Sequence, residues 1–118
     1  MSDLEGNSIL LGVTGGIAAY KAATIASLFV QAGARVDVVM TEAAQHFIQP
    51  LSFSAITHTP VYSDPFVAWH EDFTGHVGLA KKADLLIIAP ATAAAIARLA
   101  IGLADDLLGL IALSTTAP

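Results

Sequence analysis

The chain has 118 residues; 55% of them are hydrophobic, only 13% are charged, and the formal net charge is −5 at pH 7. This composition excludes a disordered chain and predicts one domain, or part of one, with a large buried core. The negative charge argues against nucleic acid or an anionic membrane as the main partner, although backbone N–H groups at a helix N-terminus can bind phosphate without basic side chains. Because no cysteine is present, disulfides, thiolate metal sites and thiol catalysis are excluded for these residues.

The distribution of apolar residues predicts a cytoplasmic protein that associates with other copies. The first seven residues are polar and acidic, unlike a signal peptide. The most apolar stretch, residues 99–113, contains Asp105 and Asp106 and is shorter than the ~20 residues that a membrane helix needs. The chain is more apolar than a small free-standing domain requires, so we expect a large subunit interface or a missing segment to cover the excess, and we do not expect a monomer.

The first half of the chain predicts a strand, a helix and a second strand. Residues 9–14 form a continuous apolar run, which is typical of a strand buried on both faces. After the glycine pair at 15–16, apolar residues recur with the helical period over residues 17–32, and Gly33 is placed to end that helix. Residues 35–40 predict the second strand, and the connection between the two strands should be right-handed.

The second half predicts further short helices and strands in alternation. We expect helices at 42–47, 50–56, 76–83, 93–100 and 105–113, strands at 60–62 and 84–89, and a loop at 63–74 that carries Trp69 and His70. The predicted fold is therefore α/β, with a parallel sheet and helices on both faces. Residues 114–118 are typical of a linker into another strand, so we expect residues 1–118 to be an incomplete domain.

Two turns at the carboxyl ends of strands are candidate ligand sites. One is the Gly15-Gly16 turn, where exposed N–H groups at a helix start favour a phosphate; a tight turn without a ligand is an equally good interpretation. The other is the run 89–95, whose small residues let the backbone approach a ligand. Thr14, Thr41 and Thr92 would face a common cleft, although Thr41 can also be a simple helix cap. The spacing of the glycines does not match the dinucleotide fingerprint.

The four histidines do not form a metal site. His46 and His58 are expected to be at the surface or partly packed, and His70 lies in the predicted loop. His76 begins a helix, where the charged imidazolium is disfavoured, so the neutral form could act as a base; a purely structural role is the alternative. No His-x-x-x-His pair or acidic cluster has metal-ligand spacing, and we predict no metal.

Three blocks, taken together in their order and spacing, resemble the flavin-dependent cysteine decarboxylase family. They are residues 12–21 (GVTGGIAAYK), residues 76–80 (HVGLA), and residues 89–93 (APATA) running on to 102–108 (GLADDLL). The resemblance covers essentially the whole chain and is greatest to members that decarboxylate 4′-phosphopantothenoylcysteine in coenzyme A biosynthesis. It implies a Rossmann-like three-layer sheet, bound FMN, and homo-oligomers that are trimers or dodecamers.

The resemblance also implies roles for individual residues. Contacts to FMN would come from Thr14, Gly15, Gly16, Ile17, Thr41, Thr92, Ala93, Ala94 and Ala95. His76 matches the family's active-site histidine. The flavin would carry the redox step on a small, phosphorylated, cysteine-containing substrate, while the protein would supply position and a proton acceptor.

Two departures from the family's pattern favour alternative functions. Ala94 and Ala95 stand where the family usually has Asn or Asp and then Thr. The family's Pro-x-Met-Asn-x-x-Met segment and a later cysteine would follow residue 118. A non-catalytic flavin-binding regulatory subunit is therefore one alternative, and a peptidyl-cysteine decarboxylase is another. A flavin prenyltransferase fits the His-Val-Gly-Leu and Pro-Ala-Thr blocks less well.

Overall fold

The computed structural model describes residues 3–63 and 76–118 and contains one parallel sheet of four strands. The strands are β1 (Ser8–Val13), β2 (Arg35–Met40), β3 (Val61–Tyr62) and β4 (Leu85–Ile88), in the order β3-β2-β1-β4. Every neighbouring pair is parallel. The first strand therefore lies in the middle, and the strand order reverses between β1 and β4, which is where ligands bind in sheets of this kind.

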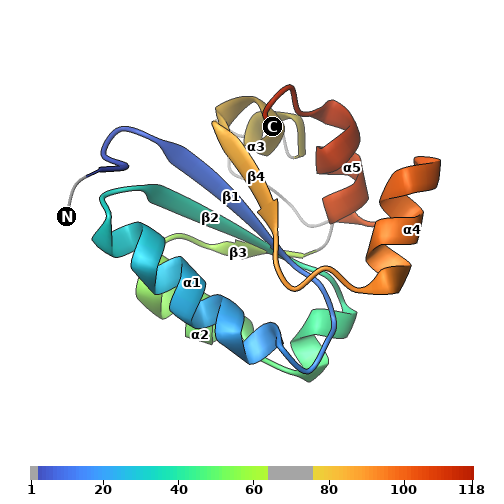
Figure 1. Ribbon diagram of the computed structural model, residues 1–118, viewed down its shortest axis with the longest axis horizontal. Helices are drawn as coiled ribbons and strands as arrows, with labels where there is room; N and C mark the ends of the chain where they lie inside the picture. The colour runs from blue at the N-terminus through green and yellow to red at the C-terminus, as the bar shows by residue number, and fades with distance from the viewer. Residues whose placement is uncertain (1–2, 64–75) are drawn as a thin grey trace.

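Helices cover both faces of the sheet, as the sequence predicted for a three-layer, Rossmann-like fold (Figure 1). The helices are α1 (Ala19–Gln31), η1 (Ala43–His46, a 3₁₀ helix), α2 (Pro50–Thr57), α3 (His76–Lys82), α4 (Ala93–Ile101) and α5 (Leu107–Ser114). α1 and α2 pack on one face, and α3 and α5 pack on the other. α4 extends past the end of the sheet beside α5, and none of its residues is buried.

The alternating directions of side chains along β1 and β2 build a core on each face of the sheet. On the side of α1 and α2 the buried residues include Leu11, Val13, Val36, Val38, Ala22, Ala26 and Phe53. On the side of α3 and α5 they include Leu10, Val39, Leu79, Leu107 and Ile111. Because successive residues of a strand point to opposite faces, a strand buried on both sides must be apolar throughout, as residues 9–13 are.

The observed elements agree with the sequence predictions except at a few ends. The strand at 35–40 is confirmed residue for residue, and Gly33, with φ +97°, ends α1 as expected. α1 begins at Ala19 rather than at residue 17, because residues 15–18 form the turn that follows β1. The predicted helix at 42–47 is a short 3₁₀ helix. The predicted loop at 63–74 lies almost wholly outside the described residues.

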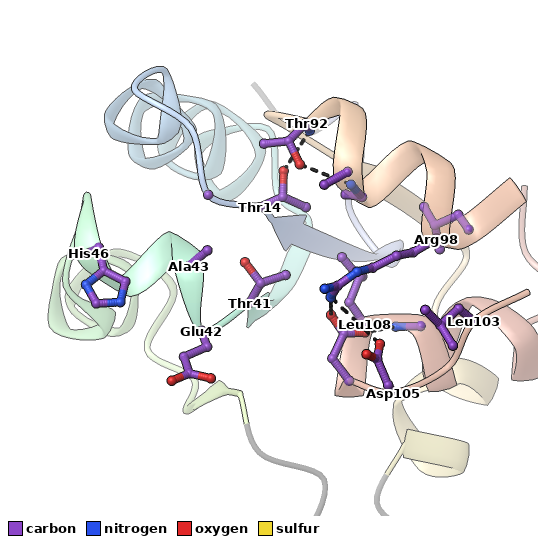
Figure 2. A pocket seen from close by; sticks show the side chains of 16 residues that line it. Thr14, Thr41, Glu42, Ala43, His46, Thr92, Arg98, Leu103, Asp105 and Leu108 are labelled. Atoms are coloured by element: carbon purple, nitrogen blue, oxygen red, sulfur yellow. Dashed lines mark hydrogen bonds and ion pairs between the residues drawn. The ribbon is translucent and has the colours of Figure 1, made fainter. Parts of the chain in front are cut away.

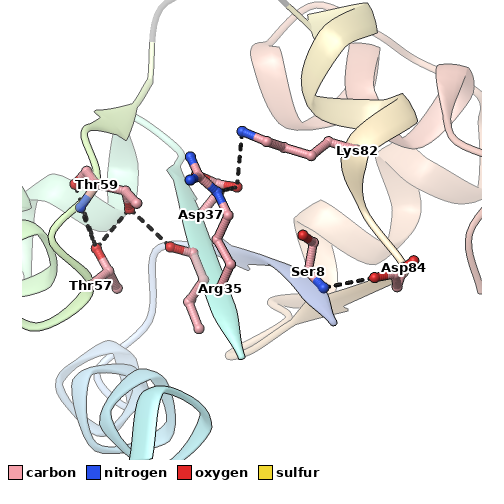
Figure 3. Close-up of polar contacts among 8 residues, drawn as sticks. Ser8, Arg35, Asp37, Thr57, Thr59, Lys82 and Asp84 are labelled. Atoms are coloured by element: carbon pink, nitrogen blue, oxygen red, sulfur yellow. Dashed lines mark hydrogen bonds and ion pairs between the residues drawn. The ribbon is translucent and has the colours of Figure 1, made fainter. Parts of the chain in front are cut away.

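A buried carboxylate ties β2 to the end of α3 (Figure 3). Asp37 is only 3% exposed, and its carboxylate lies 3.3 Å from Arg35 Nε and 3.9 Å from Lys82 Nζ. Lys82 is the last residue of α3, and the structure places its ammonium beside this buried group. A buried carboxylate needs such partners because desolvation penalises an unpaired charge.

The residues around Asp37 also make the stability of the folded protein decrease at alkaline pH. Burial raises the pKa of the Tyr62 phenol, and the nearby Asp37 raises it further, while Arg35 opposes the change. The folded protein thus favours the neutral phenol, so stability is intact below pH ~10 and falls as pH rises through the raised pKa. We expect Tyr62→Phe to lose less unfolding free energy than the parent protein between pH 8 and pH 11, as measured by urea denaturation.

Tyr20→Phe is the matched control for this prediction, because Tyr20 is 60% exposed. It should follow the parent protein across the same pH range. Equal alkaline losses for both variants would mean that Tyr62 does not contribute.

Among the described residues, no helix is both long enough and apolar enough to cross a membrane.

Candidate functional site

A cleft of about 600 Å³ opens at the carboxyl edge of the sheet (Figure 2). One wall comes from the turn after β2 and from η1, and the opposite wall comes from α4 and from the start of α5. The residues that line it are Thr14, Gly15, Thr41, Glu42, Ala43, His46, Thr92, Ala94, Ala95, Arg98, Leu99, Leu103, Asp105, Asp106, Leu108 and Gly109. The sequence prediction that Thr14, Thr41 and Thr92 face one cleft is therefore confirmed.

The turn after β1 is shaped by a close approach to the turn after β2. A Cβ on Gly15 would overlap the Cβ of Ala43 and would lie 2.8 Å from the Ala43 carbonyl carbon, so no larger residue fits here without displacing backbone. Gly16 is less constrained, since its Cβ would meet Thr92 Cγ2 at 3.6 Å. The N–H groups of residues 15–18 donate to no acceptor within the described part of the chain. Four free donors at the start of a helix can bind an anion.

Thr14 lies at the end of β1 and joins it to the segment that follows β4. Its hydroxyl donates to the Pro90 carbonyl and accepts from the Thr92 N–H at 3.0 Å. Thr92 in turn caps α4, because its own hydroxyl accepts from the Ala95 N–H at 3.1 Å. Thr14 is only 1% exposed although it lines the cleft, whereas Thr92 is half-buried.

Thr41 occupies the corresponding position at the end of β2. Its hydroxyl oxygen and its backbone carbonyl accept from the Ala44 N–H at 3.2 Å and 3.1 Å, but the N-cap of η1 is Glu42 rather than Thr41 as the sequence predicted. The hydroxyl proton takes no part in either bond. The side chain is half-buried and lies between the two walls of the cleft (Figure 2), so it can donate to a ligand there.

Charged groups line the side of the cleft formed by α4 and α5. Arg98 Nη1 lies 3.7 Å from an Asp105 carboxylate oxygen and 3.9 Å from an Asp106 oxygen. Asp106 also caps α5 by accepting from the Gly109 N–H at 2.8 Å. Arg98 and Glu42 were not among the residues predicted for the site. Arg98 could have been found, because it follows Ala94 and Ala95 by four and three residues and so shares their helix face.

The structure brings together most of the predicted cofactor residues. Thr14, Gly15, Thr41, Thr92, Ala94 and Ala95 line the cleft, whereas Gly16, Ile17 and Ala93 border it without lining it. Ile17 is 83% exposed. His76 is the first residue of α3, and its side chain lies outside the described part of the structure. Within residues 3–63 and 76–118, no three His, Asp or Glu side chains gather in a way that could hold a metal ion.

The chain is similar to known proteins in both sequence and structure. The chain is 49% identical over 118 residues to the coenzyme A biosynthesis bifunctional protein CoaBC of Vibrio cholerae serotype O1, covering 100% of the chain and 30% of that protein. The solved structure of the FMN-dependent cysteine decarboxylase SpaF matches 98% of the chain and 66% of its own length, with a TM-score of 0.85 and 30% identity. A PPC decarboxylase mutant complexed with pantothenoylaminoethenethiol matches 93% of the chain and 61% of its own length, with a TM-score of 0.80 and 30% identity.

These matches cover all or nearly all of the chain but only part of each relative. The chain spans about a third of the length of the curated relatives. The family model described as Flavoprotein, in contrast, matches residues 1–118, which is every residue of the chain. The chain therefore belongs to the Flavoprotein family.

Proposed function

We propose that the cleft binds FMN and that the chain forms the flavin domain of an enzyme that decarboxylates 4′-phosphopantothenoylcysteine to 4′-phosphopantetheine in coenzyme A biosynthesis. The observation that carries the proposal is the turn at residues 15–18, whose four free N–H groups lie beside a hydroxyl-lined cleft. The cleft volume lies in the range of ~300–1,000 Å³ that is usual for cofactor and small-molecule sites. The FMN-dependent and coenzyme A relatives support the same assignment.

The residues present fit a flavin mononucleotide. A phosphate would accept from the N–H groups of residues 15–18, with the positive end of α1 behind them. The close contact between Gly15 and Ala43 keeps the turn free of side chains at this point. Thr41 would donate its hydroxyl proton to the ligand. Ala94 and Ala95 present methyl groups from α4, which leaves a smooth wall for a flat ring.

The cofactor and the protein would have different roles in the reaction. FMN, when bound, supplies the oxidation and reduction that make loss of carbon dioxide easy. The protein holds the ligand with the turn at 15–18 and with Thr41, and α4 excludes water from one side. We assign the proton acceptor to His76, because α3 runs back to the amino end of β4 and so starts nearer the carboxyl edge where the cleft opens.

Exposed apolar residues support a homo-oligomer, which we propose to be a trimer or a dodecamer in the cytoplasm. Ile96 and Ile101 of α4 are 55% and 76% exposed, and Leu103 beyond it is 44% exposed. Removing such side chains from water is favourable, so the face of α4 suits contact with another protein surface.

A non-catalytic flavin-binding subunit is the second candidate, and Ala94 is the observation that favours it. Ala94 lines the cleft but has no polar atom on its side chain to hold a cofactor or substrate. A peptidyl-cysteine decarboxylase remains a variant of the first candidate with a different substrate.

Reconstitution with FMN tests the proposed function. After incubation with FMN and gel filtration, the purified protein should keep the yellow flavin absorption bands, and protein that stays colourless would contradict FMN binding. Release of carbon dioxide from 4′-phosphopantothenoylcysteine then separates the two candidates. Flavin binding without release favours the regulatory subunit, and release from a peptide with a C-terminal cysteine favours the peptidyl enzyme.

A further inference from the structure

The position of α4 is not explained by packing. None of the nine residues of α4 is buried, and its ion pairs through Arg98 join half-exposed groups. Exposed ion pairs of this kind contribute little to stability. The wall that Ala94 and Ala95 give to the cleft must therefore be held mainly at the start of the helix.

Hydrogen bonds from the end of β1 fix the segment that leads into α4. The Ala89 N–H donates to the Gly12 carbonyl at 2.9 Å, and the Thr14 N–H donates to the Pro90 carbonyl at 3.3 Å. The Thr14 hydroxyl adds a bond to the Pro90 carbonyl and accepts from the Thr92 N–H at 3.0 Å. Of these bonds, the last is the only one that reaches the residue that caps α4.

The Thr14 hydroxyl is already committed within the protein. A hydroxyl has one proton to donate, and that proton goes to the Pro90 carbonyl. One of its two lone pairs accepts from Thr92, and the side chain is fully buried. Thr41 differs, because its proton is not used in its bond to Ala44 and it is half-buried in the cleft.

We propose that Thr14 is a positioning residue: its hydroxyl fixes where α4 begins and so places the cleft wall at residues 92–95, without itself donating to the ligand. The hold on α4 exists without any ligand, and only its effect on FMN rests on the proposed function. Loss of the hydroxyl would leave the Thr92 N–H without a partner, and a half-buried donor of this kind must move toward water to regain one.

The test compares Thr14→Val, which keeps the shape but removes the hydroxyl, with Thr14→Ser, which keeps the hydroxyl. In the ligand-free protein, NMR hydrogen exchange at the amides of Thr92 and Ala95 should become at least tenfold faster in Thr14→Val and should return close to the parent rate in Thr14→Ser. Thr41→Val is the matched control: it removes a threonine hydroxyl at the end of β2 and should leave exchange at Thr92 and Ala95 unchanged, and the Ala44 N–H keeps the Thr41 carbonyl as an acceptor. Urea denaturation of each variant corrects these rates for global stability.

FMN titration of the same variants gives the second readout. Thr14→Val should weaken FMN binding about tenfold, the equivalent of one lost hydrogen bond, and Thr14→Ser should restore it. Unchanged exchange at Thr92 and Ala95 in Thr14→Val would overturn the proposal, and so would weaker FMN binding with unchanged exchange, since that pattern indicates direct contact. If the parent protein binds no FMN, the proposed function fails, while the exchange rates still decide the role of Thr14.

Discussion

Gly15→Ala is expected to reduce the affinity for FMN at least tenfold and to destabilise the protein by about 1–3 kcal/mol. The added methyl group would overlap Ala43 Cβ and would lie 2.8 Å and 3.1 Å from the Ala43 carbonyl carbon and oxygen. These are backbone atoms and a short side chain, which cannot rotate away. The turn at 15–18 must therefore shift, which moves the N–H groups that we propose bind the phosphate. Flavin fluorescence quenching measures the affinity, and urea denaturation measures the stability.

Gly16→Ala is the matched control for this change. Its methyl group would meet Thr92 Cγ2 at 3.6 Å and Pro90 Cγ at 3.9 Å, which are ordinary van der Waals contacts. The control variant should stay within about threefold of the parent affinity, because less than 1 kcal/mol is expected from such contacts. Equal binding by Gly15→Ala and the parent protein would show that the phosphate does not bind at this turn.

His76→Asn is expected to lower the rate of carbon dioxide release by about 10²–10⁴-fold while FMN remains bound. An asparagine side chain can donate and accept hydrogen bonds, but it cannot take up a proton near neutral pH. The flavin absorption bands should be unchanged, because the turn at 15–18 and Thr41 do not involve α3. Steady-state release of labelled carbon dioxide from 4′-phosphopantothenoylcysteine measures the rate.

His58→Asn provides the control for the His76 variant. His58 ends α2 with φ +57°, a left-handed conformation that asparagine tolerates better than most residues, so this replacement should fold normally. It should also decarboxylate at the parent rate. Full activity in His76→Asn would remove the proton-acceptor role from that residue, and loss of flavin in His76→Asn would show a binding role instead.

The sequence predicted the fold well because its strands and helices have simple physical signatures. The continuous apolar run at residues 9–13 follows from burial on both faces, and Gly33 and Gly102 mark helix ends that need a positive φ. The cleft was also predicted, because Thr14, Thr41 and Thr92 each follow a predicted strand. A parallel sheet brings its carboxyl ends to one edge, so position along the strand is enough to place them together.

Other features of the site depend on contacts between distant residues and have no local signature. Nothing in the local sequence indicates that the Thr14 hydroxyl donates to Pro90 and accepts from Thr92, because both residues are more than 70 positions away. The need for glycine at 15 rather than at 16 depends on Ala43 in another turn. The pairing of Lys82 with Asp37 has no local signature either, because the two residues lie on different elements, 45 positions apart in the sequence.

The order of the strands also sets the order in which the cleft can form during synthesis. β1, α1, β2, α2 and β3 lie within the first 62 residues and share one core, so this half can pack early. The bond between Thr14 and Thr92 spans 78 positions, and β4 and α4 emerge much later from the ribosome. The nascent chain therefore keeps one face of its sheet uncovered until α3 and α5 are made. One wall of the cleft comes from α4 and α5, so a ligand that needs both walls binds only after these helices have been made. Binding in the cleft therefore indicates that the core on the side of α3 and α5 has formed.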